Sequence, residues 1–405
     1  MKIIKNVLFS ILFFFLSFLI KRDEKYIALG SWMGNRYVDN SRYLAEYIHK
    51  NHKEYTIFWV GENIIKEEVL EKLPDAKFLE KDKFSSGLKL LRCKYMFFSQ
   101  MHNADISSYN VFRKAVMCYL HHGMPLKKWA ADGLNQGESL KQSPIKKIYC
   151  DIVSSNKKYD FFVTSSPAHD ITNCSALAFK GCTMNKNVHS GTPRNDMFFN
   201  PNEEEIKSTK LAYSERFSFN KDSKVFLYLP TYRRISNNIF SLTTLSSEER
   251  ERLTRILVEN NIVLIEKSHF SENVDFKGEN TEHIVFVDKN VNVQEMMFFS
   301  DCIISDYSGA FLDFILLNRP VIHFVYDYEY YKNIDSGLYY ELDEFAAGNI
   351  ACDFDELLAE IDNVGKGIDN NAELRKEIAN KFMAYEQGTA SQKIFERVVL
   401  NEHIA

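Results

Sequence analysis

The stretch that decides the fold runs over residues 301–326 and reads DCIISDYSGAFLDFILLNRPVIHFVY. It contains a short apolar run (302–304), a polar turn, a helical segment (310–317) and, after Pro320, a second apolar run (321–325). Strand, loop, helix and strand in this order predict a parallel βαβ unit. The loop would place a helix N-terminus at the carboxyl end of a strand, where ligands bind in open sheets and phosphate is favoured. An ordinary capped strand–helix turn explains the same residues without a ligand.

The rest of the chain repeats this alternation of short apolar runs and helical segments, which predicts an α/β fold. The turn Asn200-Pro201-Asn202 separates two such series. We therefore expect a GT-B-like architecture, with two Rossmann-like domains facing a cleft, over residues 26–200 and 201–385. Residues 386–405 are expected to form a helix that packs back over the first domain.

The composition is that of a folded protein, because 45% of the 405 residues are hydrophobic and 26% are charged. The net charge of −5 argues against nucleic acid as the main partner. The seven cysteines form an odd set without a CxxC pair, and most have apolar neighbours. This pattern favours free thiols in a reducing compartment over disulfides or a zinc site.

The N-terminus carries an apolar stretch, VLFSILFFFLSFLI, over the 14 residues 7–20, with basic residues on both sides. It is shorter than the roughly 20 residues that a membrane-spanning helix needs. A signal peptide is disfavoured because Lys21-Arg22-Asp23 stands where a small-residue cleavage site is required. We expect residues 1–25 to form a membrane-surface anchor rather than a full span.

Five polar strings carry side chains suited to chemistry. They are YLHHGMPLKKW (119–129), SGTPRND (190–196), YLPTYRR (228–234), EKSH (266–269) and the loop of the opening stretch. A histidine at a strand end could be a general base, because its pKa lies near working pH. His121 and His122 would point to opposite sides of an extended segment, so at most one of them would face a shared site. A histidine that only hydrogen-bonds a turn is the plain alternative.

The basic residues of these strings would converge if their strands are neighbours in one parallel sheet. Arg233, Lys267, His269 and the Ser308-Gly309 helix terminus would then form an anion pocket for two phosphates. A metal is not predicted, because the one Asp-x-Asp string, residues 353–355, is better explained as a helix cap.

Together the five strings resemble the CDP-glycerol glycerophosphotransferase family of teichoic-acid and capsule-type polymer synthesis. The matching segments are HHGMPLKK (121–128), GTPRND (191–196), PTYR (230–233), KSHF (267–270) and DYSG (306–309), followed by DF (313–314) and RP (319–320). Two positions depart from the family's pattern: Phe270 stands in place of a proline, and Gly309 in place of a second serine. Gly309 lacks the hydroxyl but keeps its N–H, so phosphate binding should survive.

The resemblance implies a membrane-associated enzyme that moves glycerol phosphate from CDP-glycerol to a hydroxyl of a lipid-linked acceptor and releases CMP. It implies an acceptor-side first domain, a CDP-donor-binding second domain and no cofactor. The implied catalytic residues are His122, as the base, and His269. The implied donor-binding residues are Thr231, Arg233, Lys267, Asp306, Ser308 and Gly309. Further site candidates are Lys127, Arg194, Asp196 and Asp313.

Other functions fit some of the same residues. A transferase for CDP-ribitol or another CDP-polyol would use the same strings, and a nucleotide-sugar glycosyltransferase would share the fold. A membrane-tethered scaffold with a degenerate site fits less well, because both histidines and the basic residues are present. The expected location is the cytoplasmic face of a bacterial cell membrane.

Overall fold

The chain forms two compact units in a computed structural model. Its described residues are 2–133, 144–153, 156–231, 233, 240–267, 278–288, 290–335 and 337–401. Unit 1 comprises Met1–Gly123, Ala130–Asp196 and Tyr385–Ala405, and unit 2 comprises Met124–Trp129 and Met197–Ala384. No local sequence signal separates the short stretch Met124–Trp129 from its neighbours, although it belongs to unit 2.

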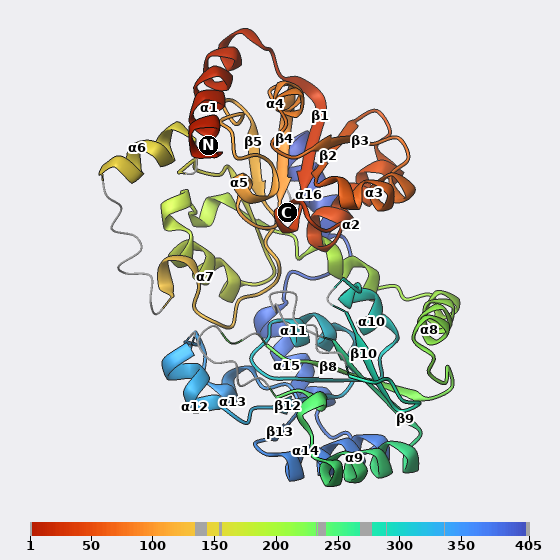
Figure 1. Cartoon of the computed structure of the whole chain (residues 1–405). Coiled ribbons are helices and arrows are strands. Elements are labelled where there is room, and N and C mark those ends of the chain that lie inside the picture. Colours follow the sequence, from red (N-terminus) through yellow and green to blue (C-terminus); the bar gives the residue numbers. More distant parts are fainter. Residues whose placement is uncertain are drawn as a thin grey trace. The chain divides into compact units, whose positions relative to one another are not determined.

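Unit 1 is built on a parallel sheet whose described strands run in the order β3-β2-β1-β4-β5-β6-β7 (Figure 1). The strands are β1 (Asp23–Gly30), β2 (Thr56–Gly61), β3 (Lys77–Glu80), β4 (Cys93–Phe98), β5 (Val116–Tyr119), β6 (Phe161–Thr164) and β7 (Asn187–His189). The helices are α1 (Lys2–Leu19), α2 (Asp39–Asn51), α3 (Lys66–Lys72), α4 (Phe84–Leu90), α5 (His102–Asp105), α6 (Pro144–Ile152), α7 (Pro167–Ala176) and α16 (Ala390–Phe395). Strand β1 begins within residues 1–25, because Asp23 already pairs with Cys93 of β4.

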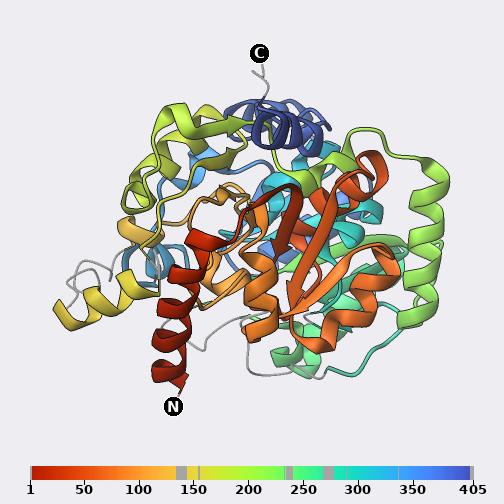
Figure 2. The ribbon, with the colours of Figure 1, turned by 90° about the horizontal axis from the view of Figure 1, so that it is seen from above.

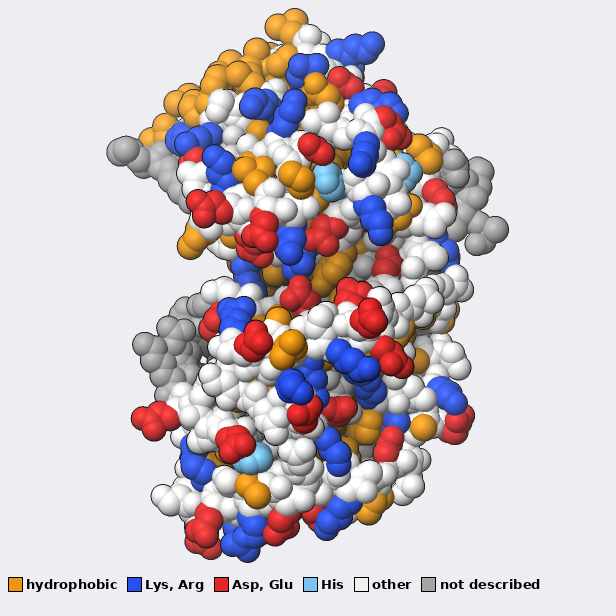
Figure 3. Space-filling view, turned by 90° about the vertical axis from the view of Figure 1, so that its right-hand side faces the viewer, with side chains coloured by type: hydrophobic (Ala, Val, Ile, Leu, Met, Phe, Trp, Pro, Cys, Tyr) orange, Lys and Arg blue, Asp and Glu red, His pale blue; other side chains and the backbone are white. Residues whose placement is uncertain are grey.

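Helix α1 lies at the edge of unit 1, beside α4 and α6 (Figure 2). Its buried side is partly polar, since Ser10, Phe13 and Ser17 face the unit. Its apolar side is exposed, and Figure 3 shows hydrophobic side chains gathered at the end of unit 1 where α1 lies, with Lys and Arg side chains beside them. Six large side chains of α1 are more than half exposed: Ile3, Ile4, Leu8, Phe15, Phe18 and Leu19. Among the described residues, no helix combines the length and the apolar character needed to cross a membrane.

The C-terminal segment, Tyr385–Ala405, packs on unit 1, where its apolar side chains are buried in the core. Ile394, Phe395, Val398 and Val399 are buried in one cluster with β1, β2 and α2 side chains. Burying such side chains stabilises by about 1.5–3 kcal/mol each. Residues 386–405 were expected to pack back in this way, although helix α16 itself ends at Phe395 and a single π-helical turn follows.

Unit 2 is built on a second parallel sheet, with its described strands in the order β10-β9-β8-β11-β12-β13. The strands are β8 (Lys224–Leu229), β9 (Ile262–Lys267), β10 (Ile284–Val287), β11 (Cys302–Ser305), β12 (Val321–Phe324) and β13 (Asn349–Ala351). The helices are α8 (Glu203–Phe217), α9 (Ser247–Glu259), α10 (Val293–Phe299), α11 (Ala310–Phe314), α12 (Tyr328–Tyr330), α13 (Leu342–Phe345), α14 (Phe354–Gly365) and α15 (Ala372–Phe382). The opening βαβ unit is thus β11, α11 and β12, and the α/β class with two doubly wound parallel sheets is confirmed.

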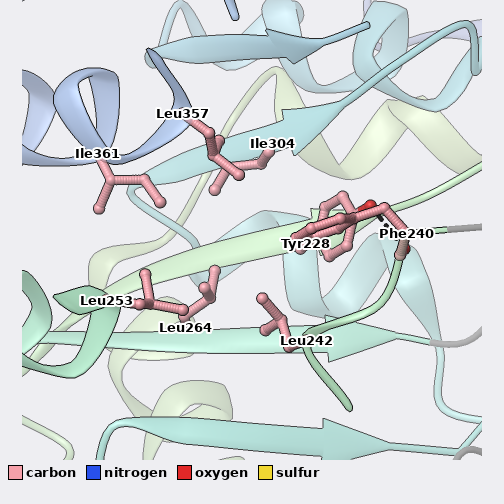
Figure 4. Close-up of a pocket in the computed structure, with 8 residues that line it drawn as sticks. All are labelled: Tyr228, Phe240, Leu242, Leu253, Leu264, Ile304, Leu357 and Ile361. Atoms are coloured by element: carbon pink, nitrogen blue, oxygen red, sulfur yellow. Dashed lines mark hydrogen bonds between the residues drawn. The ribbon is translucent and has the colours of Figure 1, made fainter. Parts of the chain in front are cut away.

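The core of unit 2 contains one small cavity that Figure 4 displays. Its free volume is about 10 Å³, and Tyr228 at its side donates a hydrogen bond to the Phe240 carbonyl at 3.0 Å. Its other lining residues are Leu242, Leu253, Leu264, Ile304, Leu357 and Ile361. A site for a small molecule needs hundreds of cubic ångströms, so this cavity is a packing gap and not a nucleotide site.

Candidate active site

Each sheet has one position at which the strand order reverses. In unit 1 this switch point lies between β1 and β4, and in unit 2 it lies between β8 and β11. Ligands of open parallel sheets bind at the carboxyl ends of the strands beside such a point. The side chains that the sequence singled out follow β5 in unit 1 and β8, β9 and β11 in unit 2, close to the two switch points.

Three histidines cluster after β5 in unit 1, and only His122 is not fully buried among them. The ring of His121 accepts a hydrogen bond from the His122 N–H at 3.0 Å and packs edge-on against His169, with ring centroids 4.6 Å apart. Burial lowers the pKa of His121 well below its usual value, and it lowers the pKa of His169 to about 3. Both rings are therefore neutral at pH 7. His122 is the partly exposed member of the group, and its predicted role as the base stays a prediction.

Arg194 lies behind this cluster in a buried ion pair. Its guanidinium is 2.9 Å from the Asp39 carboxylate, and its backbone N–H donates to the Asn40 side chain at 3.1 Å. The Asn40 amide in turn donates to the His121 carbonyl at 2.9 Å. Asp39 and Asn40 therefore tie the Arg194 loop to the end of β5, where the histidines begin.

Gly123 has a structural reason to follow His122. Its φ of +115° belongs to the left-handed region, which residues with a side chain avoid. A Cβ at this position would also collide with the Arg194 guanidinium. The His-Gly pair of the sequence string and Arg194 of the GTPRND string are thus parts of one packed arrangement.

The rest of the GTPRND string is held by the C-terminal segment. Glu386 is buried and accepts hydrogen bonds from the Thr192 N–H at 2.9 Å, the Thr192 hydroxyl at 2.8 Å and the Asn195 amide at 3.2 Å. Asp196 accepts from the N–H groups of Ala390 and Ser391 at the start of α16, at 2.7 and 2.9 Å. In the structure Asp196 therefore caps a helix, and Arg194 is the member of the string that lies nearest to the histidines.

In unit 2, β8 lies between β9 and β11, and the three strands are parallel. The polar residues that follow them can converge only if the strands are neighbours in this way. Lys267 ends β9, Thr231 follows β8, and Asp306 follows β11. The Thr231 N–H lies 3.1 Å from both carboxylate oxygens of Asp306. The strands that carry these residues are therefore neighbours, whereas the anion pocket expected at their ends stays a prediction.

Arg233 occupies the centre of this cluster with its side chain fully buried. Its guanidinium is 2.9 Å from Asp306 and 2.7 Å from Asp327, and it donates to the Thr231 carbonyl at 2.6 Å. It also lies over the Tyr331 ring, 4.7 Å from the centroid. These contacts make Arg233 a brace between the loops after β8, β11 and β12.

The Ser308-Gly309 pair begins α11. The Ser308 hydroxyl accepts a hydrogen bond from the Ala310 N–H at 3.2 Å, which closes a local turn before the helix. Gly309 is close to the carbonyl of Met124, and a Cβ at position 309 would lie only 2.5 Å from that oxygen. Gly309, which departs from the family's pattern, therefore leaves room for the backbone of the stretch Met124–Trp129.

Two further candidates also lie in unit 2. Lys127 forms an antiparallel bridge with Leu338, and Asp313 is buried in α11. His269 lies outside the described residues, so its predicted role stays a prediction. Asp353 accepts a hydrogen bond from the Glu356 N–H at 2.9 Å at the start of α14, which confirms its interpretation as a helix cap.

Sequence reasoning missed several residues of these clusters. Asp327 follows β12 and could have been found by the strand-end rule used for Asp306. His169, Asp39 and Glu386 carry no such local signal, because each meets the site from another part of the chain.

The sequence of the chain matches a known protein family. Residues 12–400 match the model of the family described as CDP-glycerol:poly(glycerophosphate) glycerophosphotransferase. A teichoic acid poly(glycerol phosphate) polymerase of Bacillus spizizenii is 25% identical over 94% of this chain and 93% of its own length. A teichoic acid glycerol-phosphate transferase of Staphylococcus aureus is 24% identical over 93% of each chain.

A solved structure agrees with the fold. The wall teichoic acid polymerase TagF superposes with a TM-score of 0.78 at 21% identity, over 99% of this chain and 96% of that one. The resemblance carried by the five sequence strings is confirmed: the chain belongs to the CDP-glycerol:poly(glycerophosphate) glycerophosphotransferase family.

Proposed function

We propose that the protein transfers glycerol phosphate from CDP-glycerol to a hydroxyl of a lipid-linked acceptor, releasing CMP, in the synthesis of a cell-surface polymer. The observation that carries this proposal is His122, a half-buried histidine at a strand end next to two histidines that burial keeps neutral. Family membership supplies the reaction class.

In the proposed reaction, His122 takes the proton from the acceptor hydroxyl. The acceptor oxygen forms a bond to the phosphorus that carries glycerol, and the bond from that phosphorus to the bridging oxygen breaks. CMP leaves with the bonding electron pair. Such transfers depend mainly on positioning and charge stabilisation. Arg194 and Asp39 would serve by holding the His122 segment in place.

The donor is assigned to unit 2, where Lys267, His269, Ser308 and the Gly309 N–H would hold the phosphates. Arg233 takes a different role from the phosphate ligand expected at first, because its guanidinium already bonds Asp306, Asp327 and the Thr231 carbonyl. We assign Arg233, Thr231 and Asp306 to shaping the donor loops.

The test is CMP release from a panel of CDP-glycerol, CDP-ribitol and a nucleotide sugar with a lipid-linked acceptor, followed by the mass of the product. CDP-glycerol is expected to release CMP and to add one or more glycerol phosphate units. Turnover of CDP-ribitol alone would reassign the donor. Transfer of a sugar without its phosphate would reject the proposed reaction.

We further propose that the exposed apolar face of α1 lies on the membrane surface at the cytoplasmic face. Arg22, just beyond the helix, ties this end of α1 to unit 1, because it donates to the carbonyls of Arg113 and Val111 at 2.8 and 2.7 Å. Lys5 and Lys21 at its ends are exposed and suit anionic headgroups. A docked helix with its apolar side outward fits a surface anchor.

Vesicle co-sedimentation tests this anchor. Ile4→Glu and Phe15→Glu are expected to weaken binding to phosphatidylglycerol vesicles at least tenfold, because each places a charge on the lipid-facing side. Ile171→Glu in α7 is the matched control, since Ile171 is 67% exposed and Ile4 is 65% exposed. Equal binding of Ile4→Glu and wild type would refute the anchor.

A further inference from the structure

The loop after β1 has an energetically unfavourable backbone conformation. Trp32, Met33 and Gly34 follow one another with φ values of 45°, 58° and 85°, all in the left-handed region. Residues with a side chain avoid this region, and consecutive cases persist only where surrounding contacts enforce them. Such enforced strain is a reason to look for a function.

The contacts that enforce this backbone come from across the switch point of unit 1. The carboxylate of Asp105, after β4, accepts hydrogen bonds from the Met33 N–H at 2.9 Å and from the Ser99 and Gln100 N–H groups at 3.0 and 2.7 Å. Lys81 donates to the Met33 carbonyl at 2.9 Å. The loop after β1 is therefore fixed to the loop after β4.

The fixed loop presents its side chains outward beside the candidate base. Met33 is 50% exposed, Trp32 is partly exposed, and the Trp32 ring centroid lies 6.2 Å from that of His122. The neighbouring Gly30 allows the close approach, because a Cβ there would collide with the Asp105 carbonyl. An aromatic ring thus lies beside His122, and the exposed Met33 side chain follows it in the same loop.

We propose that Trp32 and Met33 form the platform on which the hydroxyl-bearing end of the acceptor lies, with the reacting hydroxyl toward His122. This inference rests on the proposed function and names the acceptor contacts. Glycerol phosphate and sugar units present C–H faces as well as hydroxyls, and these faces pack against an aromatic ring or a methionine side chain. Asp105 is the positioning residue of the platform, because it acts through the Met33 backbone.

The experiment measures the acceptor KM and the CDP-glycerol Kd separately, using a synthetic acceptor that ends in glycerol phosphate. Trp32→Ala is expected to raise the acceptor KM at least tenfold and to leave the CDP-glycerol Kd, from calorimetry, within twofold. Trp32→Phe should recover most of the loss. Met33→Ala should raise the acceptor KM about threefold or more, whereas the matched control Met184→Ala, 56% exposed in the same unit, should leave it unchanged.

An unchanged acceptor KM in both Trp32→Ala and Met33→Ala would overturn the platform. A parallel rise in the CDP-glycerol Kd would also overturn it, because the loop would then hold the donor. If wild type releases no CMP from any CDP-polyol, the proposed function fails instead. The platform is then decided by calorimetry with the synthetic acceptor alone, where equal binding by wild type and Trp32→Ala rejects it.

Discussion

The switch points of the two units are built around buried aspartates that do similar work in different electrostatic surroundings. Asp105 in unit 1 and Asp306 in unit 2 each accept hydrogen bonds from the loop after the first strand of their sheet, from Met33 and Thr231 respectively. Asp306 also pairs with the buried Arg233 at 2.9 Å. Asp105 is held by three backbone N–H groups, and burial raises its pKa to about 7.

Because of this difference, we expect the loops of the two units to respond differently to pH. The Arg233 brace compensates the charge of Asp306 and fixes the loops of unit 2 at any ordinary pH. Asp105 fixes a strained loop with a carboxylate that changes its charge near neutral pH. Unit 2 is therefore expected to be the rigid side of the enzyme, and unit 1 the side where loop geometry responds to conditions.

The largest effect is expected from Arg233→Met. It leaves Asp306 and Asp327 facing a buried space without their cation, which should destabilise unit 2 by about 3–5 kcal/mol. Calorimetric unfolding measures the loss. Arg252→Met is the control, because the Arg252–Asp355 pair is exposed and should contribute about 0–1 kcal/mol. Equal effects of the two substitutions would show that Arg233 is not a brace.

A smaller effect is expected from adding a methyl group at each switch point. Gly30→Ala drives a Cβ into the Asp105 backbone carbonyl at the end of β1, and we expect a loss of about 1–3 kcal/mol in the free energy of unfolding. Gly309→Ala meets the Met124 carbonyl on a loop, so it should cost less. Chemical denaturation of both variants compares them. A larger loss for Gly309→Ala would contradict this ranking, because it would show that the Met124 carbonyl cannot move away from the added methyl group.

A third comparison is the pH dependence of Asp105→Asn. Burial raises the Asp105 pKa, with Lys81 opposing the rise. Between about pH 4 and pH 7 the folded wild type holds a proton that the unfolded chain releases, so its stability falls as pH rises through this range. The asparagine side chain does not titrate, so the variant lacks this loss of stability as pH rises. Its unfolding midpoint should therefore improve relative to wild type from pH 5 to pH 8, and a constant difference would contradict a raised pKa.

The strand-end rule explains why much of the site could be predicted from sequence. Apolar runs mark β8, β9 and β11, and polar residues directly after such runs must lie at one edge of a parallel sheet. Thr231, Lys267 and Asp306 were found in this way. Asp327, after β12, follows the same rule and was missed.

Other features could not be predicted, because they depend on contacts between distant parts of the chain. Glu386 reaches Thr192 across 194 residues, and His169 meets His121 through tertiary packing alone. The composition of α1 predicted an apolar helix but not that Ser10 and Ser17 would lie on its buried side. No local pattern reveals that the Arg233 guanidinium forms ion pairs with two carboxylates, those of Asp306 and Asp327.

The most direct measurement is the rate of glycerol phosphate transfer by His122→Ala together with its Kd for CDP-glycerol. Removing a general base should lower the rate by about 10²–10⁴-fold. Because the donor is assigned to unit 2, the Kd should stay within twofold of wild type. A variant that transfers at the wild-type rate, or that loses CDP-glycerol affinity in step with the rate, would contradict the assignment of His122 as the base of unit 1.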